Sequence, residues 1–232
     1  VASSKLIETA FRNALQCDVT SAFGGVILIN RKMSVDLAKQ ISNSFFEIVV
    51  ATSYDQLCLD ILAKRKNLIL LKIKKLNMKK REFKSTIFGT VYQDNSSIKI
   101  NKRFLRTVSK KNTSSKLVED IIFSLKVVKH LNSNAIVLSY NKQTLGIGSG
   151  FTSRIEAIKT ALEKVRLNFK NKKFVCASDG FFPFTDSLKI LKKNRCNVVA
   201  QPSGSINDNE IINFANKNNI SLFFTKNRLF KH

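Results

Sequence analysis

The segment from Ser178 to Asp186 has the composition of a ligand-binding wall. It places three phenylalanines and a proline between two carboxylates, in the order Ser-Asp-Gly-Phe-Phe-Pro-Phe-Thr-Asp. It follows a short apolar run at 174–177 that is predicted to be a buried strand, after which a polar turn is the usual continuation. An apolar cluster at such a strand exit predicts a surface that contacts a ligand. The alternative is that the phenylalanines fold back into the core, which is less expected of all three than of any one.

A second candidate site is the glycine turn Gly148-Ser149-Gly150, which comes just before Ser153 and Arg154. Glycine allows close approach of the backbone, and the start of the helix predicted there offers unpaired N–H donors. Arg154 adds a forked cation that suits an anionic group. The turn therefore predicts an anion site, although a glycine turn before a helix is common and is weak evidence by itself.

Short strands alternate with amphipathic helices around both segments. This alternation predicts an α/β fold, with a parallel or mixed sheet covered by helices. In such sheets ligands bind at the carboxyl ends of strands, which is where 178–186 and 201–205 are placed. The predicted strands are 174–177, 197–200 and 221–225, and the predicted helices are 186–194 and 208–218.

The chain also repeats itself, which predicts two copies of one α/β unit. The join is expected between Lys74 and Lys116, giving subdomains at 1–115 and 116–232 with a basic linker near 74–86. Residues 134–150 lead into the second copy and have no counterpart before the first, so the chain is expected to be a fragment. The paired segments are 3–7 with 152–155, 22–25 with 178–181, 47–53 with 197–203, and 67–71 with 219–223.

Composition limits the class of protein. The 232 residues are 44% hydrophobic, enough for a substantial core in one or two domains. No apolar run is long enough to span a bilayer, so a cytoplasmic protein is expected. The net charge of +24 allows an alternative, a catalytically inactive basic domain that binds nucleic acid or acts as a scaffold. The densest basic run, 72–84, favours a solvated linker instead, because its first ten residues contain no aromatic side chain to stack on bases.

The cysteines do not predict a metal site. They are scattered along the chain, with no paired-cysteine spacing and no His-x-Glu motif, so no transition metal is expected. Dispersed cysteines of this kind are typical of reduced core residues in a cytosolic protein. The four residues are Cys17, Cys58, Cys176 and Cys196.

Taken together, the motifs resemble a bifunctional purine-biosynthesis family over nearly the whole chain and in the same order. That family joins aminoimidazole carboxamide ribonucleotide (AICAR) formyltransferase to inosine monophosphate (IMP) cyclohydrolase. In the first half the matching segments are 20–25, 46–51 and 64–67. In the second half they are 133–137, 147–150 with 153–154, 178–184, 202–205 and 227–232.

The resemblance implies a fold and an activity. The fold would be two cytidine-deaminase-like α/β/α subdomains, in agreement with the internal repeat. The activity would be transfer of a formyl group from the cosubstrate 10-formyltetrahydrofolate to AICAR, at sites formed across a homodimer. Neither a membrane nor nucleic acid is an expected partner.

The resemblance also implies roles for individual residues. Positions similar to the nucleotide site of the family are Gly24, Glu47, Lys66, Arg154, Phe181 and Arg228, together with Asn134 as the catalytic residue present in this chain. Cationic members would neutralise phosphate, and Glu47 and Asn134 would hold ribose or carboxamide groups. Positions similar to the folate site are Ile155, Pro183, Phe184, Asp186 and Ser205, where apolar groups would face the pterin and Asp186 would accept from its amino group.

Some parts of the family pattern are missing or changed. The catalytic Lys-His-x-x-Pro-Cys-Gly segment of the family would lie just before Val1, and the cyclohydrolase domain has no counterpart in this sequence. The chain is therefore expected to bind better than it catalyses, because formyl transfer to a weak arylamine nucleophile needs a base. Lys129-His130 is not expected to replace it. Thr185 stands where the family commonly has arginine, and Gly180, in place of alanine, is expected to change little.

Overall fold

The computed structural model describes residues 1–74, 81–94, 99–169 and 172–231. These residues form two compact units, which are considered separately: Val1–Ser21 with Ile100–His232, and Ala22–Lys99. The predicted division into 1–115 and 116–232 stays a prediction. In the structure, residues 1–21 and 100–115 belong to the same unit as 116–232. Val1 lies along the sheet of the larger unit, where its carbonyl oxygen accepts from Thr144 N at 2.9 Å.

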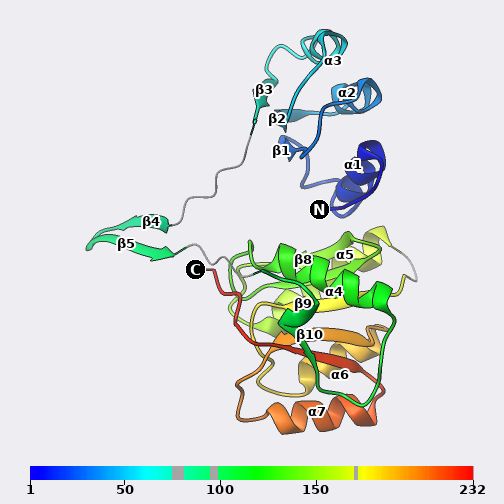
Figure 1. Ribbon diagram of the computed structural model, residues 1–232, viewed down its shortest axis with the longest axis vertical. Helices are drawn as coiled ribbons and strands as arrows, with labels where there is room; N and C mark the ends of the chain where they lie inside the picture. The colour runs from blue at the N-terminus through cyan, green and yellow to red at the C-terminus, as the bar shows by residue number, and fades with distance from the viewer. Residues whose placement is uncertain (75–80, 95–98, 170–171, 232) are drawn as a thin grey trace. The chain divides into compact units, whose positions relative to one another are not determined.

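The larger unit is built on a six-stranded mixed sheet with the strand order β6-β11-β10-β9-β7-β8 (Figure 1). Strands β9, β10 and β11 are parallel to one another, whereas β6, β7 and β8 each pair in antiparallel fashion. The carboxyl ends of the parallel strands therefore meet at one edge. The bounds are β6 Leu105–Thr107, β7 Ile136–Tyr140, β8 Gln143–Gly148, β9 Val175–Ser178, β10 Val198–Pro202 and β11 Ser221–Thr225.

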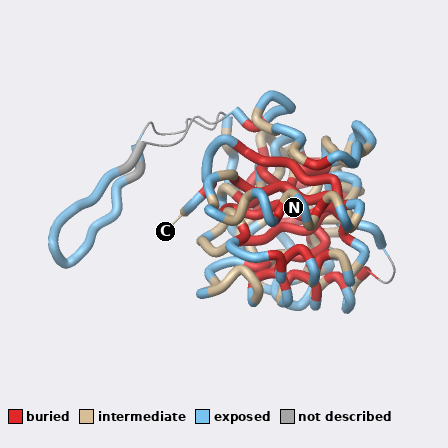
Figure 2. Tube along the Cα trace, turned by 90° about the horizontal axis from the view of Figure 1, so that it is seen from below, coloured by how far each residue is buried: buried red, intermediate tan, exposed pale blue. Residues whose placement is uncertain are grey.

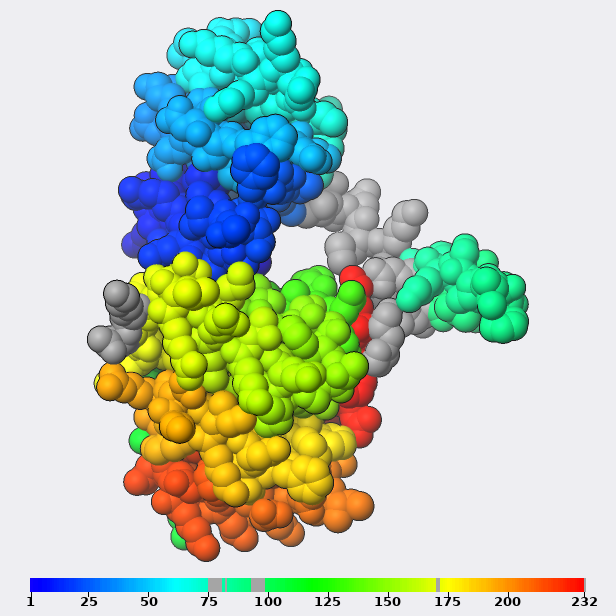
Figure 3. Space-filling model, turned by 180° about the vertical axis from the view of Figure 1, so that it is seen from behind, coloured from blue at the N-terminus to red at the C-terminus, as the bar shows by residue number. Residues whose placement is uncertain are grey.

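Helices cover both faces of this sheet. Helix α4 packs against β7, β9 and β10, while α5, α6 and α7 form a row that Figure 3 shows closing one side, in yellow-green to orange. Serine caps begin two of the helices: Ser114 Oγ accepts from Leu117 N, and Ser153 Oγ from Glu156 N. The bounds are α1 Ile7–Gln16, η1 Lys102–Phe104, α4 Ser115–Val128, α5 Arg154–Asn168, α6 Asp186–Lys193 and α7 Asp208–Lys217.

Helix α5 lies unusually close to β8 because two glycines leave room for it. A Cβ atom at Gly146 would lie 2.0 Å from the carbonyl oxygen of Ala161, and one at Gly148 would lie 2.1 Å from that of Ala157. Both distances are far below van der Waals contact, so only glycine fits at these positions. Ala157 and Ala161 are themselves fully buried. The strand and the helix thus meet through backbone and methyl groups.

The smaller unit contains a three-stranded parallel sheet in the order β1-β2-β3. Leu37 and Ile41 of α2 and Leu62 of α3 are at most 1% exposed and form its core with Val49 of β2. The register places Val26 and Ile69 on either side of Ile48, and Leu28 and Leu71 on either side of Val50. The bounds are β1 Gly25–Leu28, α2 Val35–Ser42, β2 Phe46–Ala51, α3 Gln56–Leu62 and β3 Ile69–Lys72.

One face of this small sheet is open. We call Val26, Leu28, Ile69 and Leu71 the open face, because their exposed fractions are 64%, 58%, 54% and 46%. A parallel sheet is normally covered on both faces, so four exposed aliphatic side chains on one of them are unusual. The larger unit shows the usual arrangement, since every residue of its three parallel strands is buried.

The remaining element is an antiparallel hairpin of β4 (Arg81–Thr86) and β5 (Gly89–Asp94). Residues 81–86 of the predicted linker near 74–86 form a strand, and residues 75–80 lie outside the described residues, so the linker stays a prediction. Two cross-strand pairs lie on the same face of the hairpin, Phe83 with Tyr92 and Ser85 with Thr90, and aromatic and β-branched residues of this kind favour strands. No helix among the described residues could cross a membrane.

The predicted mixed α/β fold and its internal repeat are confirmed by the topology. The order strand-helix-strand-helix-strand, with parallel strands, occurs in β1-α2-β2-α3-β3 and again in β9-α6-β10-α7-β11. Val49 pairs with both neighbours of β2, and Val199 pairs with both neighbours of β10. The proposed pairing of 22–25 with 178–181 is wrong, because 22–25 lead into β1 whereas 178–181 leave β9.

Candidate functional site

A buried ion pair lies where β9 ends and α5 begins. Arg154 Nη2 is 3.5 Å from Asp179 Oδ1, and the side chains are 15% and 0% exposed. Burial lowers the pKa of the Arg154 guanidinium; the Asp179 carboxylate opposes this shift, and the nearby Arg228 cation adds to it. The main chain holds Asp179 from two sides, since its N–H donates to Ala135 O and its carbonyl oxygen accepts from Leu229 N.

Aromatic rings surround the two arginines. The guanidinium carbon of Arg228 lies 4.9 Å from the ring centre of Phe181 and 5.6 Å from that of Phe230, and that of Arg154 lies 5.8 Å from Phe230. Cations at these distances are attracted by ring faces, which also restrict their movement. Two arginines and one buried carboxylate leave a net positive charge. The arrangement is therefore suited to an anion with a flat apolar part.

Several buried polar atoms of this region have no hydrogen-bond partner among the described residues. They are Arg154 Nε, both carboxylate oxygens of Asp179, and Gln201 Nε2. Buried polar atoms are normally paired, so unmet donors and acceptors in one region are a signature of a binding site. The sequence placed 201–205 at the carboxyl end of a strand but gave Gln201 no role of its own.

Gly180 lies against the side chains of Arg154 and Phe230. A Cβ atom there would lie 1.9 Å from Arg154 Nη2 and 2.7 Å from Cε1 of Phe230. Alanine at this position would require the guanidinium to move from its place beside Asp179, which the flexible arginine side chain allows. The expectation that Gly180 changes little stays a prediction.

The three phenylalanines of 178–186 have three different environments. Phe182 is fully buried in the core, Phe181 is half-buried under Arg228, and Phe184 is 60% exposed. The backbone N–H of Phe182 donates to Gln201 Oε1 at 3.0 Å, which ties the loop after β9 to β10. The predicted wall therefore consists of Phe181 and Phe184, and Phe182 is its anchor.

Asn134 anchors the loop that precedes α5. Its side-chain Nδ2 donates to the carbonyl oxygens of Phe151 and Thr152, at 3.0 Å in each case. Both N–H bonds of the amide are thereby used, which leaves Oδ1 as the atom suited to a ligand. Thr152 and Arg154 are close in the chain, so Asn134 also helps to place the start of α5.

Of the predicted folate residues, Pro183, Phe184 and Ser205 lie on the loops after β9 and β10, whereas Ile155 lies in the first turn of α5 and Asp186 begins α6. Pro183 and Asp186 are exposed, whereas Ile155 and Ser205 are half-buried. Asn207 joins the loops by donating from Nδ2 to the carbonyl oxygen of Pro183 at 2.7 Å. The loops thus form one apolar and polar rim beside the arginine cluster.

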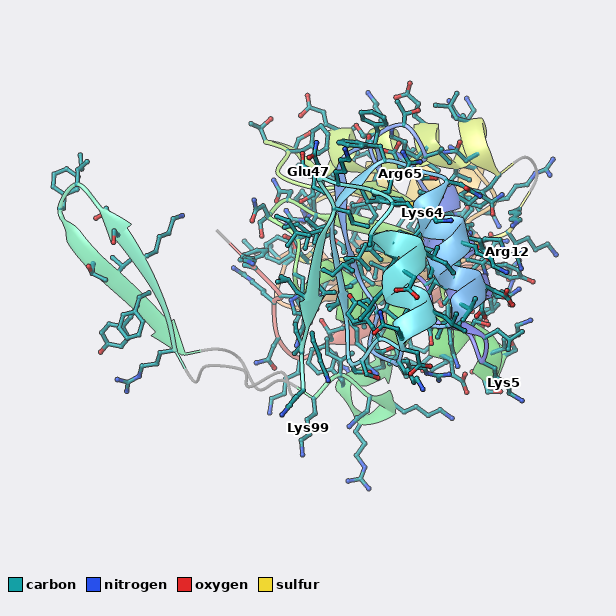
Figure 4. The ribbon with its side chains drawn as sticks, turned by 90° about the horizontal axis from the view of Figure 1, so that it is seen from above. Lys5, Arg12, Glu47, Lys64, Arg65 and Lys99 are labelled. Atoms are coloured by element: carbon teal, nitrogen blue, oxygen red, sulfur yellow. The ribbon has the colours of Figure 1, made fainter. Side chains whose placement is uncertain are left out.

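The other predicted residues belong to the smaller unit and lie at the amino ends of its strands. Gly24 has φ +70°, and a Cβ atom there would lie 3.5 Å from the ring of Phe45 and 3.8 Å from Glu47 Oε1. Phe45 and Lys66 line a hollow of about 250 Å³. Its other lining residues are Ile41, Ser44, Phe46, Lys64, Arg65, Asn67 and Leu68. Figure 4 labels Glu47, Lys64 and Arg65 on this unit.

The structure thus gathers the predicted residues into two groups, one in each unit. Arg154, Phe181 and Arg228 form the first group with the folate candidates, and Gly24, Glu47 and Lys66 form the second. The cysteines are free and buried, and the described part of the chain has no cluster of three or more His, Cys, Asp or Glu suited to a metal.

Comparison with known proteins points to one family. A family model described as AICARFT/IMPCHase bienzyme matches residues 1–164. A bifunctional purine biosynthesis protein PurH of Fusobacterium nucleatum is 41% identical over 234 residues, covering 100% of this chain and 46% of that protein. The corresponding PurH of Buchnera aphidicola is 42% identical over 238 residues, covering 100% and 45%. The chain spans about half the length of the curated relatives it matches.

Among solved structures, a dCMP deaminase from the cyanophage S-TIM5 matches 47% of this chain and 98% of its own. The sequence identity is 13% and the TM-score is 0.31. A likeness of this size carries no argument, so the cytidine-deaminase-like fold stays an implication of the family resemblance.

Proposed function

Because the chain belongs to the AICARFT/IMPCHase bienzyme family, we propose that it serves formyl transfer from 10-formyltetrahydrofolate to AICAR in purine biosynthesis. The observation that carries this proposal is the cluster of Arg154 and Arg228 on the rings of Phe181 and Phe230. It combines positive charge with flat apolar surfaces at the carboxyl edge of a parallel sheet. A nucleotide such as AICAR has a matching phosphate and a flat heterocycle.

In this proposal, the nucleotide is held by charge-assisted hydrogen bonds. Arg154 and Arg228 bind its phosphate or carboxamide group, and each such bond contributes about 1.5–3 kcal/mol. Asn134 offers Oδ1 to a donor on the nucleotide. In the smaller unit, considered by itself, Lys66 and Glu47 beside Gly24 are the candidates for phosphate and ribose groups that the family resemblance implies.

The folate cosubstrate is proposed to lie along the rim of the loops after β9 and β10. Pro183 and Phe184 are exposed and would contact the pterin, and the half-buried Ile155 is the further apolar candidate. Asp186 would accept from the pterin amino group, and Ser205 adds a hydroxyl. This loop rim supports the proposal because exposed apolar side chains bounded by carboxylate and hydroxyl groups suit an aromatic heterocycle.

The chemical step would proceed through a tetrahedral intermediate. The exocyclic amine of AICAR attacks the formyl carbon, the carbon–N10 bond of the folate then breaks, and the amine loses a proton while N10 gains one. The attacking amine gains positive charge as its bond to the formyl carbon forms, and a fixed acceptor beside it stabilises that charge. We assign this role to Oδ1 of Asn134, because both N–H bonds of its amide already hold the loop.

For the whole protein we propose the IMP cyclohydrolase activity of the family and a homodimer. The free, buried cysteines fit a cytoplasmic protein, because thiols stay reduced in that compartment. The alternative, a basic nucleic-acid-binding or scaffold domain, depends on the run 72–84. Residues 75–80 of this run lie outside the described residues. In the described part the guanidinium carbon of Arg81 lies 5.2 Å from the ring centre of Tyr92, one cation–ring pair where a nucleic-acid groove uses a series of stacking positions.

The test is calorimetric titration with AICAR and with the same nucleoside lacking its phosphate. We expect saturable binding of AICAR and at least tenfold weaker binding of the nucleoside, because the arginines would lose their anionic partner. Formyl transfer is followed in parallel from 10-formyltetrahydrofolate, with Asn134→Ala as the variant. Equal affinities for the two ligands, or no binding of either, would contradict the proposal.

A further inference from the structure

The tip of the β4–β5 hairpin is apolar where turns are normally polar. Ile87 and Phe88 form the two-residue connection between the strands, and their exposed fractions are 93% and 94%. Two-residue hairpin turns favour Asn, Asp and Gly, because these residues tolerate the required backbone and interact with water. The side chains of isoleucine and phenylalanine are not stabilised by contact with water. Their presence at the tip indicates that this surface is buried against another molecule or segment.

The apolar character continues along the strands. Phe83 and Tyr92 face each other across the hairpin with ring centres 6.1 Å apart, and they are 67% and 64% exposed. Val91, next to Tyr92 in the same strand, points to the opposite face and is 55% exposed. Residues 85–92 contain no charged side chain, although the chain as a whole carries a net charge of +24. Figure 2 shows the hairpin in the colour of exposed residues.

A hairpin of this kind needs a partner. An isolated two-stranded hairpin is marginally stable in water, and both of its strands present unpaired backbone groups on their outer edges. Beyond their mutual pairing, β4 and β5 have no extensive contact with any other helix or strand of the described chain. Order in such a hairpin requires apolar contacts from outside it.

We propose that the β4–β5 hairpin is an arm that docks on a second copy of this chain. This inference rests on the homodimer of the proposed function and names the surface that forms it. The arm inserts Ile87 and Phe88 between the copies, and Phe83 and Tyr92 extend the contact along its length.

A second copy fits the hairpin better than other partners. Nucleic acid requires several cations along its contact surface, whereas residues 85–92 carry none and the cations of β4, Arg81 and Lys84, come before them. A lipid surface would contact the tip alone, whereas the apolar side chains here occupy both faces of the hairpin. Every copy also carries the open face of β1-β2-β3, four aliphatic side chains that are 46% to 64% exposed. Each copy thus offers both an apolar arm and an apolar surface to receive one.

The first experiment measures association by sedimentation equilibrium. The variant Ile87→Asn/Phe88→Asn keeps the hairpin, because asparagine favours such turns, but it removes the apolar tip. We expect its dimer dissociation constant to rise at least tenfold above that of the unsubstituted chain. The matched control is Leu57→Gln/Leu167→Gln, which removes two other large apolar side chains that are 64% and 68% exposed. This control should associate as the unsubstituted chain does.

The second experiment identifies what the tip touches. A photoreactive phenylalanine analogue at position 88 is cross-linked in a mixture of nitrogen-15-labelled and unlabelled chains. Cross-linked peptide pairs of mixed isotope are expected, because the tip contacts another copy. Pairs from one isotope only would show that the tip folds back on its own chain, and this result would overturn the inference.

The outcomes also separate this inference from the proposed function. A dimer that is unchanged by Ile87→Asn/Phe88→Asn would overturn the arm and leave the dimer standing. A chain that stays monomeric but binds AICAR would overturn the arm and the homodimer and leave the nucleotide site standing. Monomeric chain that sediments with phosphatidylserine–phosphatidylcholine vesicles, and loses this on substitution of the tip, would assign the hairpin to a lipid surface instead.

Discussion

The two strand-helix-strand-helix-strand repeats share a topology but differ in where they present candidate ligand-binding residues. In the larger unit Phe181 and Ser205 follow the carboxyl ends of β9 and β10, whereas in the smaller unit Gly24 and Lys66 precede β1 and β3. The covering also differs, because α4 closes a sheet face in the larger unit and the smaller sheet keeps its open face. The two repeats therefore share their strands and helices but carry their candidate residues at opposite ends of the strands.

The largest expected effect is on the free energy of unfolding, and it tests whether one sheet face is covered in the larger unit and open in the smaller one. Leu125 of α4 is fully buried against the larger sheet, and Leu28 on the open face is 58% exposed. Leu125→Ala should reduce the free energy of unfolding by about 2–5 kcal/mol, because it leaves a cavity. Leu28→Ala should cost less than ~1 kcal/mol, since it removes surface already in water. Denaturant titrations measure both, and similar losses would show that the open face is covered in solution.

The next effect asks whether both units contribute to nucleotide binding. Arg154→Ala should weaken AICAR binding roughly tenfold or more, because it removes a charge-assisted contact. Lys66→Ala should weaken binding by a smaller factor, because a solvent-exposed lysine gains less from an anion. Calorimetry with Lys129→Ala as the control, expected to be nearly silent, gives the comparison. Equal losses for all three variants would indicate non-specific attraction to a basic chain.

A third effect concerns the buried thiols of the larger unit. Burial raises the pKa of Cys196 to about 12 and that of Cys176 well above its usual value. A raised folded-state pKa gives stability that is complete below the unfolded pKa and is lost as pH rises. Unfolding free energy should therefore fall above about pH 9, by roughly 1.4 kcal/mol per pH unit for Cys196. Denaturation at pH 8, 9 and 10 measures this slope.

The matched variant for this pH dependence is Cys196→Ala, which should have a flatter slope over the same range. Alkylation by iodoacetamide at pH 8 gives a second measurement, because the thiolate is the reactive form. Cys176 and Cys196 should react at least tenfold more slowly in the folded chain than after unfolding. Rapid alkylation of either under native conditions would show that the larger unit opens readily.

The smallest effect lies at a surface pair that joins the start of the chain to α5. Lys164 Nζ is 2.7 Å from Asp18 Oδ2, and the side chains are 32% and 29% exposed. Burial raises the pKa of Asp18, but hydrogen bonds from Lys164 and Ser21 outweigh it and leave that pKa below its usual value. The pair therefore stabilises the chain above the unfolded pKa of the carboxyl group and loses this contribution as pH falls. Asp18→Asn should cost less than ~1 kcal/mol at pH 7 in thermal unfolding.

Periodicity predicted every element of the larger unit from β9 to β11. The strand expected at 221–225 is β11, and the helices expected at 186–194 and 208–218 are α6 and α7, each ending one residue earlier. The strand at 81–86 was not predicted. The lysines around Phe83 hide its pairing with Tyr92 on the next strand, and the turn Ile87-Phe88 lacks the Asn-Gly signal of a hairpin.

Contacts between segments distant in sequence could not be predicted in the same way. The pairing of Arg154 with Asp179 depends on how α5 lies against the sheet, and no local pattern encodes that distance. The loop that carries Phe182 is tied to Gln201, nineteen residues later, by a hydrogen bond from its backbone N–H. Residue types indicated that 178–186 would form a site. They did not indicate which of its rings would be buried.

The two glycines of β8 beneath α5 set the distance of that helix from the sheet, and so also the position of Arg154 at its start. Gly148 lies under Ala157, three residues after Arg154, and Gly146 lies one turn further along under Ala161. A methyl group at 148 alone would lift the first turn more than the rest and tilt the helix axis. The guanidinium would then swing away from Asp179 although no atom of the site had been altered. The position of the Arg154 side chain thus depends on Gly146 and Gly148, which have no side chain and do not touch the site themselves.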